Sequence, residues 1–164
     1  MAKSISVEHM QKTKKQVVFR EVMEKDAKEL ASLFSDANVK NYEKAIKRSI
    51  KGKSVKGFVA ESNGSIIGHI KASFSGEPYA HIVELKSLIV RPDYRGKGIG
   101  LGLYKYAISK TGKNKKIAIA RVRTINEPSV KLHEKLGFKI VGEIKGGWQK
   151  GNEKKDIFIF AKNL

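Results

Sequence analysis

Cysteine is absent from this chain of 164 residues, so disulfides, thiolate metal sites and a cysteine nucleophile are excluded. The four histidines (His9, His69, His81 and His133) are scattered without the spacing of metal ligands, and we expect no metal site. The chain also lacks an apolar run that could span a bilayer, and it lacks a signal-peptide pattern. The sequence therefore predicts a cytoplasmic protein without a membrane segment.

Acidic residues are scarce: 16 Asp and Glu stand against 34 Lys and Arg, which gives a net charge of +18. The basic residues cluster at 44–56 and at 110–116. This excess favours anionic partners, so an acidic acceptor, a nucleic acid or the ribosome stays open as a partner. A lysine-rich surface adapted for solubility or heat is the alternative explanation.

Glycine is concentrated in one turn, Arg95-Gly96-Lys97-Gly98-Ile99-Gly100, between the apolar run Leu88-Ile89-Val90 and a predicted helix. A helix start presents unpaired N–H groups and the positive end of the helix dipole, which together bind phosphate. Glycine lets the backbone adopt a positive φ close to an anion. A nucleoside triphosphate loop would need Ser or Thr where Gly98 stands, and a dinucleotide loop would need glycine at Leu101 or Leu103. The turn therefore predicts a diphosphate site of another kind.

The glycine loop resembles the R/Q-x-x-G-x-G/A motif of the GNAT superfamily of N-acetyltransferases, which holds the pyrophosphate of acetyl-coenzyme A (acetyl-CoA). The resemblance runs from Leu85 to Gly100 without a gap. A second stretch, Asn126 to Phe138, is similar to the N-x-x-S/A-x-x-L-Y-x-K-x-G-F motif of the same superfamily. In these motifs the chain is most similar to the branches of the superfamily that resemble phosphinothricin, amino-acid and ribosomal-protein acetyltransferases. A glycine-rich turn that serves only packing is the alternative.

The order of the predicted elements fits this resemblance. Strands are predicted at 16–20, 58–61, 66–74, 81–90, 116–122, 138–144 and 156–161. Helices are predicted at 26–34, 42–50, 99–109 and 126–136, with an Asn63-Gly64 turn and a Gly146-Gly147 loop. The expected fold is an α/β (α+β) GNAT domain over residues 16–164, with a mixed central sheet of about seven strands, a splayed parallel pair and about four flanking helices. Residues 1–15 are expected to form a basic N-terminal tail.

The resemblance implies that the pantetheine arm of acetyl-CoA lies between the strands at 81–90 and 116–122, bonded to the backbone as an added strand would be. An amide near Leu88 would polarise the thioester carbonyl. The residues that the resemblance assigns to the cofactor lie on the strand end, the glycine loop and the second motif: Leu88, Ile89, Val90, Arg95, Gly96, Lys97, Gly98, Ile99, Gly100, Leu101, Asn126, Ser129 and His133.

Two residues are candidates for proton transfer. His133 stands where the family often carries a tyrosine that protonates the leaving thiolate, and an ordinary histidine pKa of about 6.5 suits that role. A helix histidine that only contacts the cofactor or the sheet is the alternative. Glu84 is the candidate base for the amine, and a period of two places it on the same face as Lys86, Leu88 and Val90. A structural carboxylate paired with Lys86 is the alternative.

The sequence therefore predicts an enzyme, an acetyltransferase that moves the acetyl group directly from acetyl-CoA to a primary amine in a ternary complex. The acceptor stays open among a small amine, an amino-acid derivative and a protein or peptide amine. Trp148 is expected to line either the acceptor pocket or a dimer or core surface, so a homodimer is also open. The alternative function is a nucleic-acid-binding module with an inherited, idle acetyltransferase-like fold, which the net charge suggests.

Overall fold

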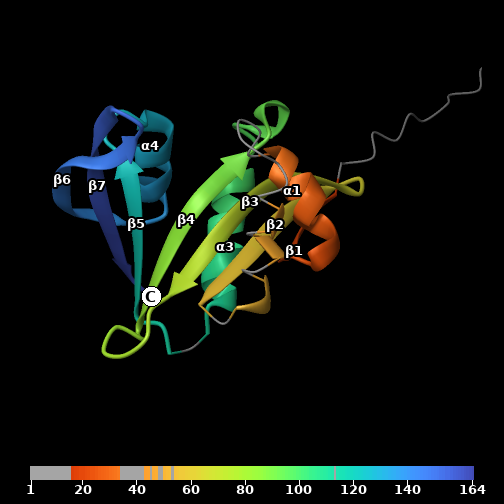
Figure 1. Cartoon of the computed structure of the whole chain (residues 1–164), viewed down its shortest axis with the longest axis horizontal. Helices are drawn as coiled ribbons and strands as arrows, with labels where there is room; N and C mark the ends of the chain where they lie inside the picture. Colours follow the sequence, from red (N-terminus) through yellow and green to blue (C-terminus); the bar gives the residue numbers. More distant parts are fainter. Residues whose placement is uncertain (1–15, 34–42, 45, 48–49, 53, 113) are drawn as a thin grey trace, which may run out of the picture.

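One mixed β-sheet runs through the part of the chain that the computed structural model describes, which is residues 16–33, 43–44, 46–47, 50–52, 54–112 and 114–164. Within those residues, seven strands lie in the order β1-β2-β3-β4-β5-β7-β6 (Figure 1). The strands are β1 (Val17–Glu21), β2 (Val55–Ser62), β3 (Ser65–Phe74), β4 (Ile82–Val90), β5 (Ile117–Arg123), β6 (Lys139–Lys150) and β7 (Glu153–Asn163). The predicted mixed sheet is confirmed.

Three α-helices have defined bounds in the described part of the chain: α1 (Ala27–Leu33), α3 (Ile99–Lys110) and α4 (Glu127–Lys135). Two short 3-10 helices, η1 (Glu24–Asp26) and η2 (Pro92–Tyr94), precede α1 and the glycine loop. The helix predicted at 42–50 falls partly outside the described residues, of which 43–44, 46–47 and 50–51 are helical. The predicted tail at 1–15 lies outside them altogether, so this tail and the domain limits of 16–164 stay predictions.

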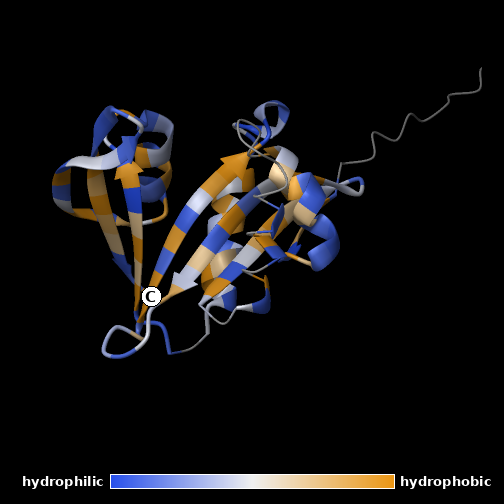
Figure 2. Ribbon diagram, in the orientation of Figure 1, coloured by the Kyte–Doolittle hydropathy of each residue, from blue (hydrophilic) through white to orange (hydrophobic). Residues whose placement is uncertain are grey.

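Helices cover both faces of the half of the sheet formed by β1 to β4. On one face, Leu103, Tyr104 and Ala107 of α3 are almost fully buried against the strands. On the other face, Leu30 of α1 packs in a second cluster with Val59 of β2. Figure 1 shows α3 behind the strands and α1 in front of them, and Figure 2 shows apolar and polar residues alternating along the strands. Alternation is typical of a strand with one buried face, whereas β3, which is covered on both faces, buries every residue from Ile66 to Ile70.

The parallel strands β4 and β5 part soon after they begin. Their paired residues are confined to Ile82–Glu84 on β4 and Ile117–Ile119 on β5. Beyond this point the two strands diverge toward their carboxyl ends, so that β1 to β4 and β5, β7 and β6 form two halves (Figure 1). The predicted splayed pair is therefore confirmed, and the carboxyl half of β4 has no strand partner on its β5 side among the described residues.

A bulge in β4 corrects the predicted facing of its side chains. The register with β3 shifts between His69 and Lys71, and Ser87 of β4 has a positive φ of 56°. An extra residue in one strand reverses the alternation beyond it. Leu88 and Val90 therefore pack against the core on the α3 side, whereas Glu84 precedes the bulge. The prediction that Glu84 shares a face with Leu88 and Val90 is wrong.

Of the two glycine-containing turns that the sequence predicts, the structure has one. The Asn63-Gly64 turn is confirmed, because both residues have positive φ and join β2 to β3. The loop predicted at Gly146-Gly147 is wrong, because both glycines lie inside the continuous strand β6. A Cβ on Gly147 would come within 2.5 Å of the Ile157 side chain on β7, so glycine is needed there for close strand packing.

Candidate active site

The glycine loop leads from β4 into α3 through two residues with left-handed backbone. Gly96 has a φ of 73° and Gly98, the N-cap residue of α3, has a φ of 79°. Residues other than glycine rarely adopt such positive φ angles, so the loop conformation depends on glycine. A Cβ at either position would meet nothing within 4 Å, which leaves open space in front of the loop. A diphosphate could approach the backbone through this space.

The first turn of α3 is open to an anion. No side chain caps this helix start, and no acidic residue lies in its first turn. The helical hydrogen bonds begin with the amide of Gly102, which donates to the Gly98 carbonyl at 2.9 Å. The preceding amides of Ile99, Gly100 and Leu101 therefore have no helical acceptor, as at every helix start. Together with the dipole of this 12-residue helix, they give the helix start a geometry that suits an anion.

Two basic side chains of the loop brace its conformation. Arg95 Nε donates to the Val90 carbonyl at 3.0 Å. Lys97 Nζ donates to the Asp93 carbonyl at 2.7 Å and lies 5.4 Å from the ring centroid of Tyr94. Both residues are exposed, so their charges stand beside the open helix start. They thus serve the loop geometry and add positive potential to it.

Gly100 joins the two sequence motifs in space. A Cβ at this position would lie 3.3 Å from Leu88 Cδ2 on β4 and 3.5 Å from Leu132 Cδ2 on α4. The first turn of α3 therefore sits against both elements, with Leu88, Leu132 and Val90 around it. The glycine loop and the second motif therefore lie next to each other in the structure.

The second motif begins at the same edge of the sheet. Parallel strands point to the same end of the sheet, so the segments that follow β4 and β5 both lie at that end, on the two sides of the gap between the strands (Figure 1). Asn126 is the N-cap residue of α4, and its Oδ1 accepts a hydrogen bond from the Ser129 amide at 3.3 Å. This contact is the helix cap that the residue types predict.

His133 lies inside the molecule with both ring nitrogens engaged. The residue is 2% exposed. Its Nδ1 lies 2.7 Å from the Ser129 carbonyl oxygen, and its Nε2 lies 2.6 Å from the Tyr104 hydroxyl oxygen. A carbonyl only accepts, so Nδ1 carries the proton and Nε2 accepts from the tyrosine. Burial lowers the pKa of His133, which favours the neutral ring.

Glu84 lies where β4 and β5 begin to diverge. It is the last β4 residue in the parallel register, opposite Ile119 of β5. Its carboxylate is 3.7 Å from Lys86 Nζ and 3.6 Å from Arg121 Nε. The side chain is 17% exposed, so the carboxylate is reachable from solvent. The structure thus realises the predicted ion pair with Lys86 and adds a second cation from the neighbouring strand.

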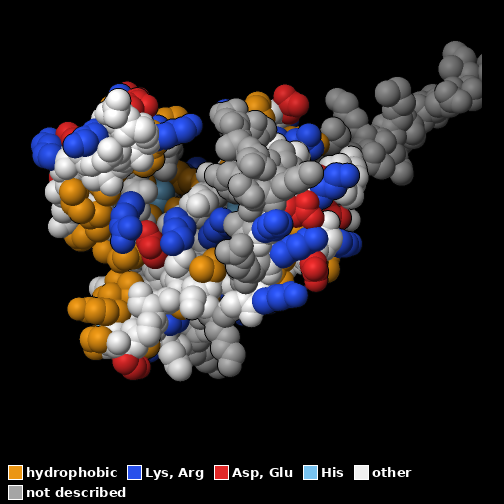
Figure 3. All heavy atoms as spheres, viewed as in Figure 1, with side chains coloured by type: hydrophobic (Ala, Val, Ile, Leu, Met, Phe, Trp, Pro, Cys, Tyr) orange, Lys and Arg blue, Asp and Glu red, His pale blue; other side chains and the backbone are white. Residues whose placement is uncertain are grey.

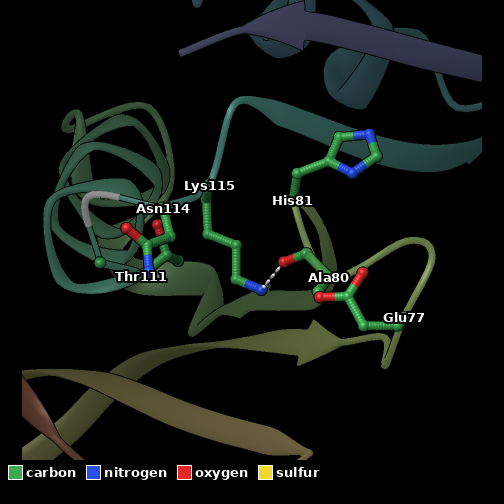
Figure 4. A pocket seen from close by; sticks show the side chains of 7 residues that line it. Glu77, Ala80, His81, Thr111, Asn114 and Lys115 are labelled. Atoms are coloured by element: carbon green, nitrogen blue, oxygen red, sulfur yellow. Dashed lines mark hydrogen bonds between the residues drawn. The ribbon is translucent and has the colours of Figure 1, made fainter.

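Two cavities lie at opposite ends of the strands. One of about 400 Å³ borders the glycine loop and is lined by Val17, Asp93, Tyr94, Lys97 and Ile99. The other, of about 530 Å³, lies at the end where β4 and β5 begin (Figure 4). In this cavity Lys115 Nζ donates a hydrogen bond to the Ala80 carbonyl, and the His81 ring points away from that hydrogen bond. The second cavity contains none of the predicted site residues.

Sequence reasoning missed three residues of this region. The positive φ at Ser87 left no signal, because serine gives no hint of left-handed backbone. Tyr104 reaches His133 across 29 positions of sequence, which no local pattern shows. Arg121 had a usable signal, since it alternates with the buried residues Ala120 and Val122 on β5 and must face the other side.

The described residues contain no group of three or more His, Asp or Glu side chains that could hold a metal ion. None of their helices is long and apolar enough to cross a membrane.

The chain matches one family model and several known proteins. The Acetyltransferase (GNAT) family model matches residues 19–138. The L-amino acid N-acyltransferase MnaT of Escherichia coli is 34% identical over 91 residues, which cover 52% of this chain and 51% of MnaT. The N-alpha-acetyltransferase of Saccharolobus solfataricus is 30% identical over 118 residues, which cover 65% of this chain and 68% of that protein. The chain thus spans about half the length of several curated relatives that it matches.

Solved structures share the fold. The ribosomal-protein-alanine N-acetyltransferase of Brucella melitensis superposes with a TM-score of 0.78 at 24% identity, covering 90% of this chain and 99% of that chain. The acetyltransferase yncA of Salmonella typhimurium, solved with its cofactor acetyl-CoA, gives 0.76 at 20% identity, covering 90% and 94%.

Proposed function

The chain belongs to the GNAT family of acetyltransferases, and on that premise we propose that it transfers an acetyl group directly from acetyl-CoA to a primary amine in a ternary complex. The observation that carries this proposal is the left-handed glycine loop that opens α3 beside the unpaired carboxyl half of β4. The acetyl-CoA in the yncA structure supports the choice of donor, because that protein shares this fold.

The residues of this site fit acetyl-CoA. The amides of Gly96 to Leu101 would hold the pyrophosphate, with Arg95 and Lys97 adding positive charge. The backbone of Leu88 to Val90, on the open side of β4, would bond the pantetheine as an added strand. Asn126 and Ser129 would border it at the start of α4. When bound, acetyl-CoA supplies the acetyl group as an activated thioester.

The chain's own groups have three roles in the proposal. An amide near Leu88 would donate a hydrogen bond to the thioester carbonyl of bound acetyl-CoA. Glu84 would accept a proton from the attacking amine, directly or through water, because it is an accessible carboxylate where the strands part. The C–S bond would break as the C–N bond forms, and the departing thiolate would take its proton from solvent. His133 positions α4 against α3 through Tyr104 instead of acting as the direct proton donor, because both of its ring nitrogens are engaged inside the core.

The acceptor is a primary amine of a small amine, an amino-acid derivative or a peptide. The names of relatives support this range: MnaT acts on L-amino acids, and other relatives are named methionine sulfoximine and N-alpha-acetyltransferases. The nucleic-acid-binding alternative is not favoured, because the match to the acetyltransferase model covers most of the chain. The cytoplasmic location and an association with the ribosome stay predictions.

The homodimer also stays a prediction. Edge strand β6 exposes Ile140, Val141 and Ile144, which gives the dimer a candidate surface. Sedimentation at several protein concentrations would detect such a dimer, and a single monomeric species at all concentrations would remove it.

Calorimetric titration with coenzyme A tests the proposed site. Gly98→Glu places a strained, negative residue at the anion site and should abolish measurable binding. Gly112→Glu is the matched control, because Gly112 follows the other end of α3 with a φ of 95° and open space around its Cβ position. Equal binding by wild type and Gly98→Glu would contradict the assignment of the loop.

A further inference from the structure

The sheet face opposite α3 is strongly basic around the point where β4 and β5 diverge. On β5, Arg121 and Arg123 alternate with residues that are buried on the α3 side. On β3 and β4, Lys71 and Lys86 occupy directly paired positions. Figure 3 shows Lys and Arg side chains gathered across the middle of this face, between the two halves of the sheet. Glu84 is the single acidic residue in β3, β4 and β5, so positive charge dominates there.

The pairing of Lys71 with Lys86 is unfavourable in the free protein. Like charges directly opposite each other on neighbouring strands repel. Burial lowers the pKa of Lys71, and the charge of Lys86 lowers it further. An anion bound between such groups relieves this repulsion, so a ligand of negative charge would be favoured at this place.

The cations nearest to Glu84 can reach a ligand. Lys86 and Arg121 contact the carboxylate at 3.7 and 3.6 Å, which are long distances for ion pairs. Their side chains are 44% and 58% exposed, so both charged groups keep contact with solvent. They come from the two strands that diverge at this point: Lys86 lies two residues beyond Glu84 on β4, and Arg121 lies two residues beyond Ile119, the partner of Glu84, on β5. A single carboxylate therefore faces two accessible cations.

Arg123 extends the basic surface along β5. Its guanidinium carbon lies 5.0 Å from the ring centroid of Trp148 on β6, which is a cation–π contact. Trp148 thus lies beside the basic residues of β5, and its place at the acceptor stays a prediction.

We propose that the acceptor carries a carboxylate close to its amine, and that Lys86 and Arg121 bind this carboxylate while Glu84 faces the amine. This inference rests on the proposed acetyl transfer and names its substrate class. An amino acid supplies the carboxylate from its own α-carboxyl group, and a peptide supplies it from an acidic side chain beside its N-terminus. Both sources present the same chemistry, an amine and an anion within a few bonds of each other.

Matched pairs of acceptors test the proposal and separate the two sources. The first pair is methionine and methioninamide, and the second is the peptide amides Ser-Asp-Ala and Ser-Asn-Ala. Each pair differs by one negative charge, so the ratio of kcat/KM within a pair reports recognition of the anion. We expect the anionic member of at least one pair to be preferred about tenfold or more. Calorimetric binding of the same compounds to the coenzyme A complex gives a readout independent of turnover.

The variants Lys86→Gln and Arg121→Gln should each reduce the preference in kcat/KM for the anionic acceptor about tenfold. Each variant should also weaken the binding of that acceptor by a similar factor. Arg121→Lys keeps the charge and should restore part of the preference. Lys105→Gln is the matched control, because Lys105 is an exposed cation on α3, on the other side of the sheet. Thermal unfolding of each variant confirms that it is folded.

Acetylation of both members of each pair without preference would overturn this inference and leave the proposed function intact. An equal loss of preference in Lys105→Gln would overturn it as well, because general surface charge would then explain the effect. Absence of acetylation in every arm, together with absence of coenzyme A binding, would overturn the proposed function itself.

Discussion

Tyr104 on α3 and His133 on α4 are joined by a buried hydrogen bond, with 2.6 Å between Oη and Nε2. α3 packs against β2, β3 and β4, whereas the His133 ring lies 5.0 Å from the ring of Phe160 on β7. The bond therefore links the two halves of the sheet on the side of α3, behind the point where β4 and β5 diverge. Burial raises the pKa of Tyr104 and lowers that of His133, so both groups stay neutral around pH 7.

Removing the tyrosine hydroxyl should destabilise the protein. Tyr104→Phe leaves His133 Nε2 buried without its donor, which costs about 1–3 kcal/mol in the free energy of unfolding. Tyr106→Phe is the control, since Tyr106 lies on the same helix and contributes its ring to stacking with Phe19. Urea unfolding at pH 7 measures both. A loss in Tyr104→Phe no larger than that in Tyr106→Phe would show that the hydrogen bond contributes little.

The role of His133 can be read from pH profiles. If His133 is a positioning residue, His133→Phe should lower kcat at every pH, while the shape of the pH profile and the affinity for coenzyme A stay the same. If His133 is the direct proton donor, His133→Phe should instead remove the alkaline limb of the kcat profile. Steady-state rates between pH 6 and about pH 9 separate these outcomes, and loss of that limb would contradict the positioning role.

Replacement of Glu84 should slow proton removal from the amine. Glu84→Gln should lower kcat at pH 7 by about 100-fold, because a general base contributes about that much or more. Raising the pH should restore part of the rate, since more of the amine is then already deprotonated. Glu134→Gln, an exposed carboxylate on α4, should leave the rate unchanged. A wild-type rate in Glu84→Gln would show that solvent alone removes the proton.

Stability should fall in mild acid because of buried His69. Burial, helped by the charge of Lys71, lowers the pKa of His69 to about 3 in the folded protein. The unfolded chain has the ordinary value of about 6.5, so below that pH the unfolded state binds a proton that the folded state does not. The free energy of unfolding then decreases as the pH falls, by up to about 1.4 kcal/mol per pH unit. His133, whose pKa is also lowered, contributes in the same direction.

Urea unfolding between pH 7 and about pH 4.5 measures this slope, in a range where most carboxylates stay ionised. His69→Gln removes one titrating group and should make the slope shallower, though the variant is less stable at pH 7. An unchanged slope in His69→Gln would mean that His69 does not supply this dependence.

The backbone features that follow from single residue types could be predicted from the sequence. Asn63-Gly64 formed the expected hairpin, and Gly98 begins α3 where the motif placed it, because positive φ selects these residues locally. Asn126 caps α4 because its side-chain oxygen accepts a hydrogen bond from the backbone, which is another local preference of the residue type. These local signals were enough to identify the glycine loop, the second motif and the family.

Features that depend on contacts between distant strands could not be predicted. The bulge at Ser87 reverses the facing of Leu88 and Val90, and its cause lies in the register with β3. Gly147 looked like a loop residue, but the proximity of Ile157 on the paired strand explains it. The placement of Arg121 beside Glu84 likewise required knowledge that β4 and β5 are neighbours.

Acetyl transfer to a primary amine can be measured with acetyl-CoA and a panel of amines that includes amino acids, peptides and small amines. Mass spectrometry of the acceptors and quantification of released coenzyme A report the reaction from both sides. We expect acetylated amine and free coenzyme A in equal amounts with wild-type protein, and neither above background with Gly98→Glu. Acetylation that persists in Gly98→Glu at the wild-type rate, or the absence of acetylation with every amine, would show that this site does not transfer acetyl groups to amines.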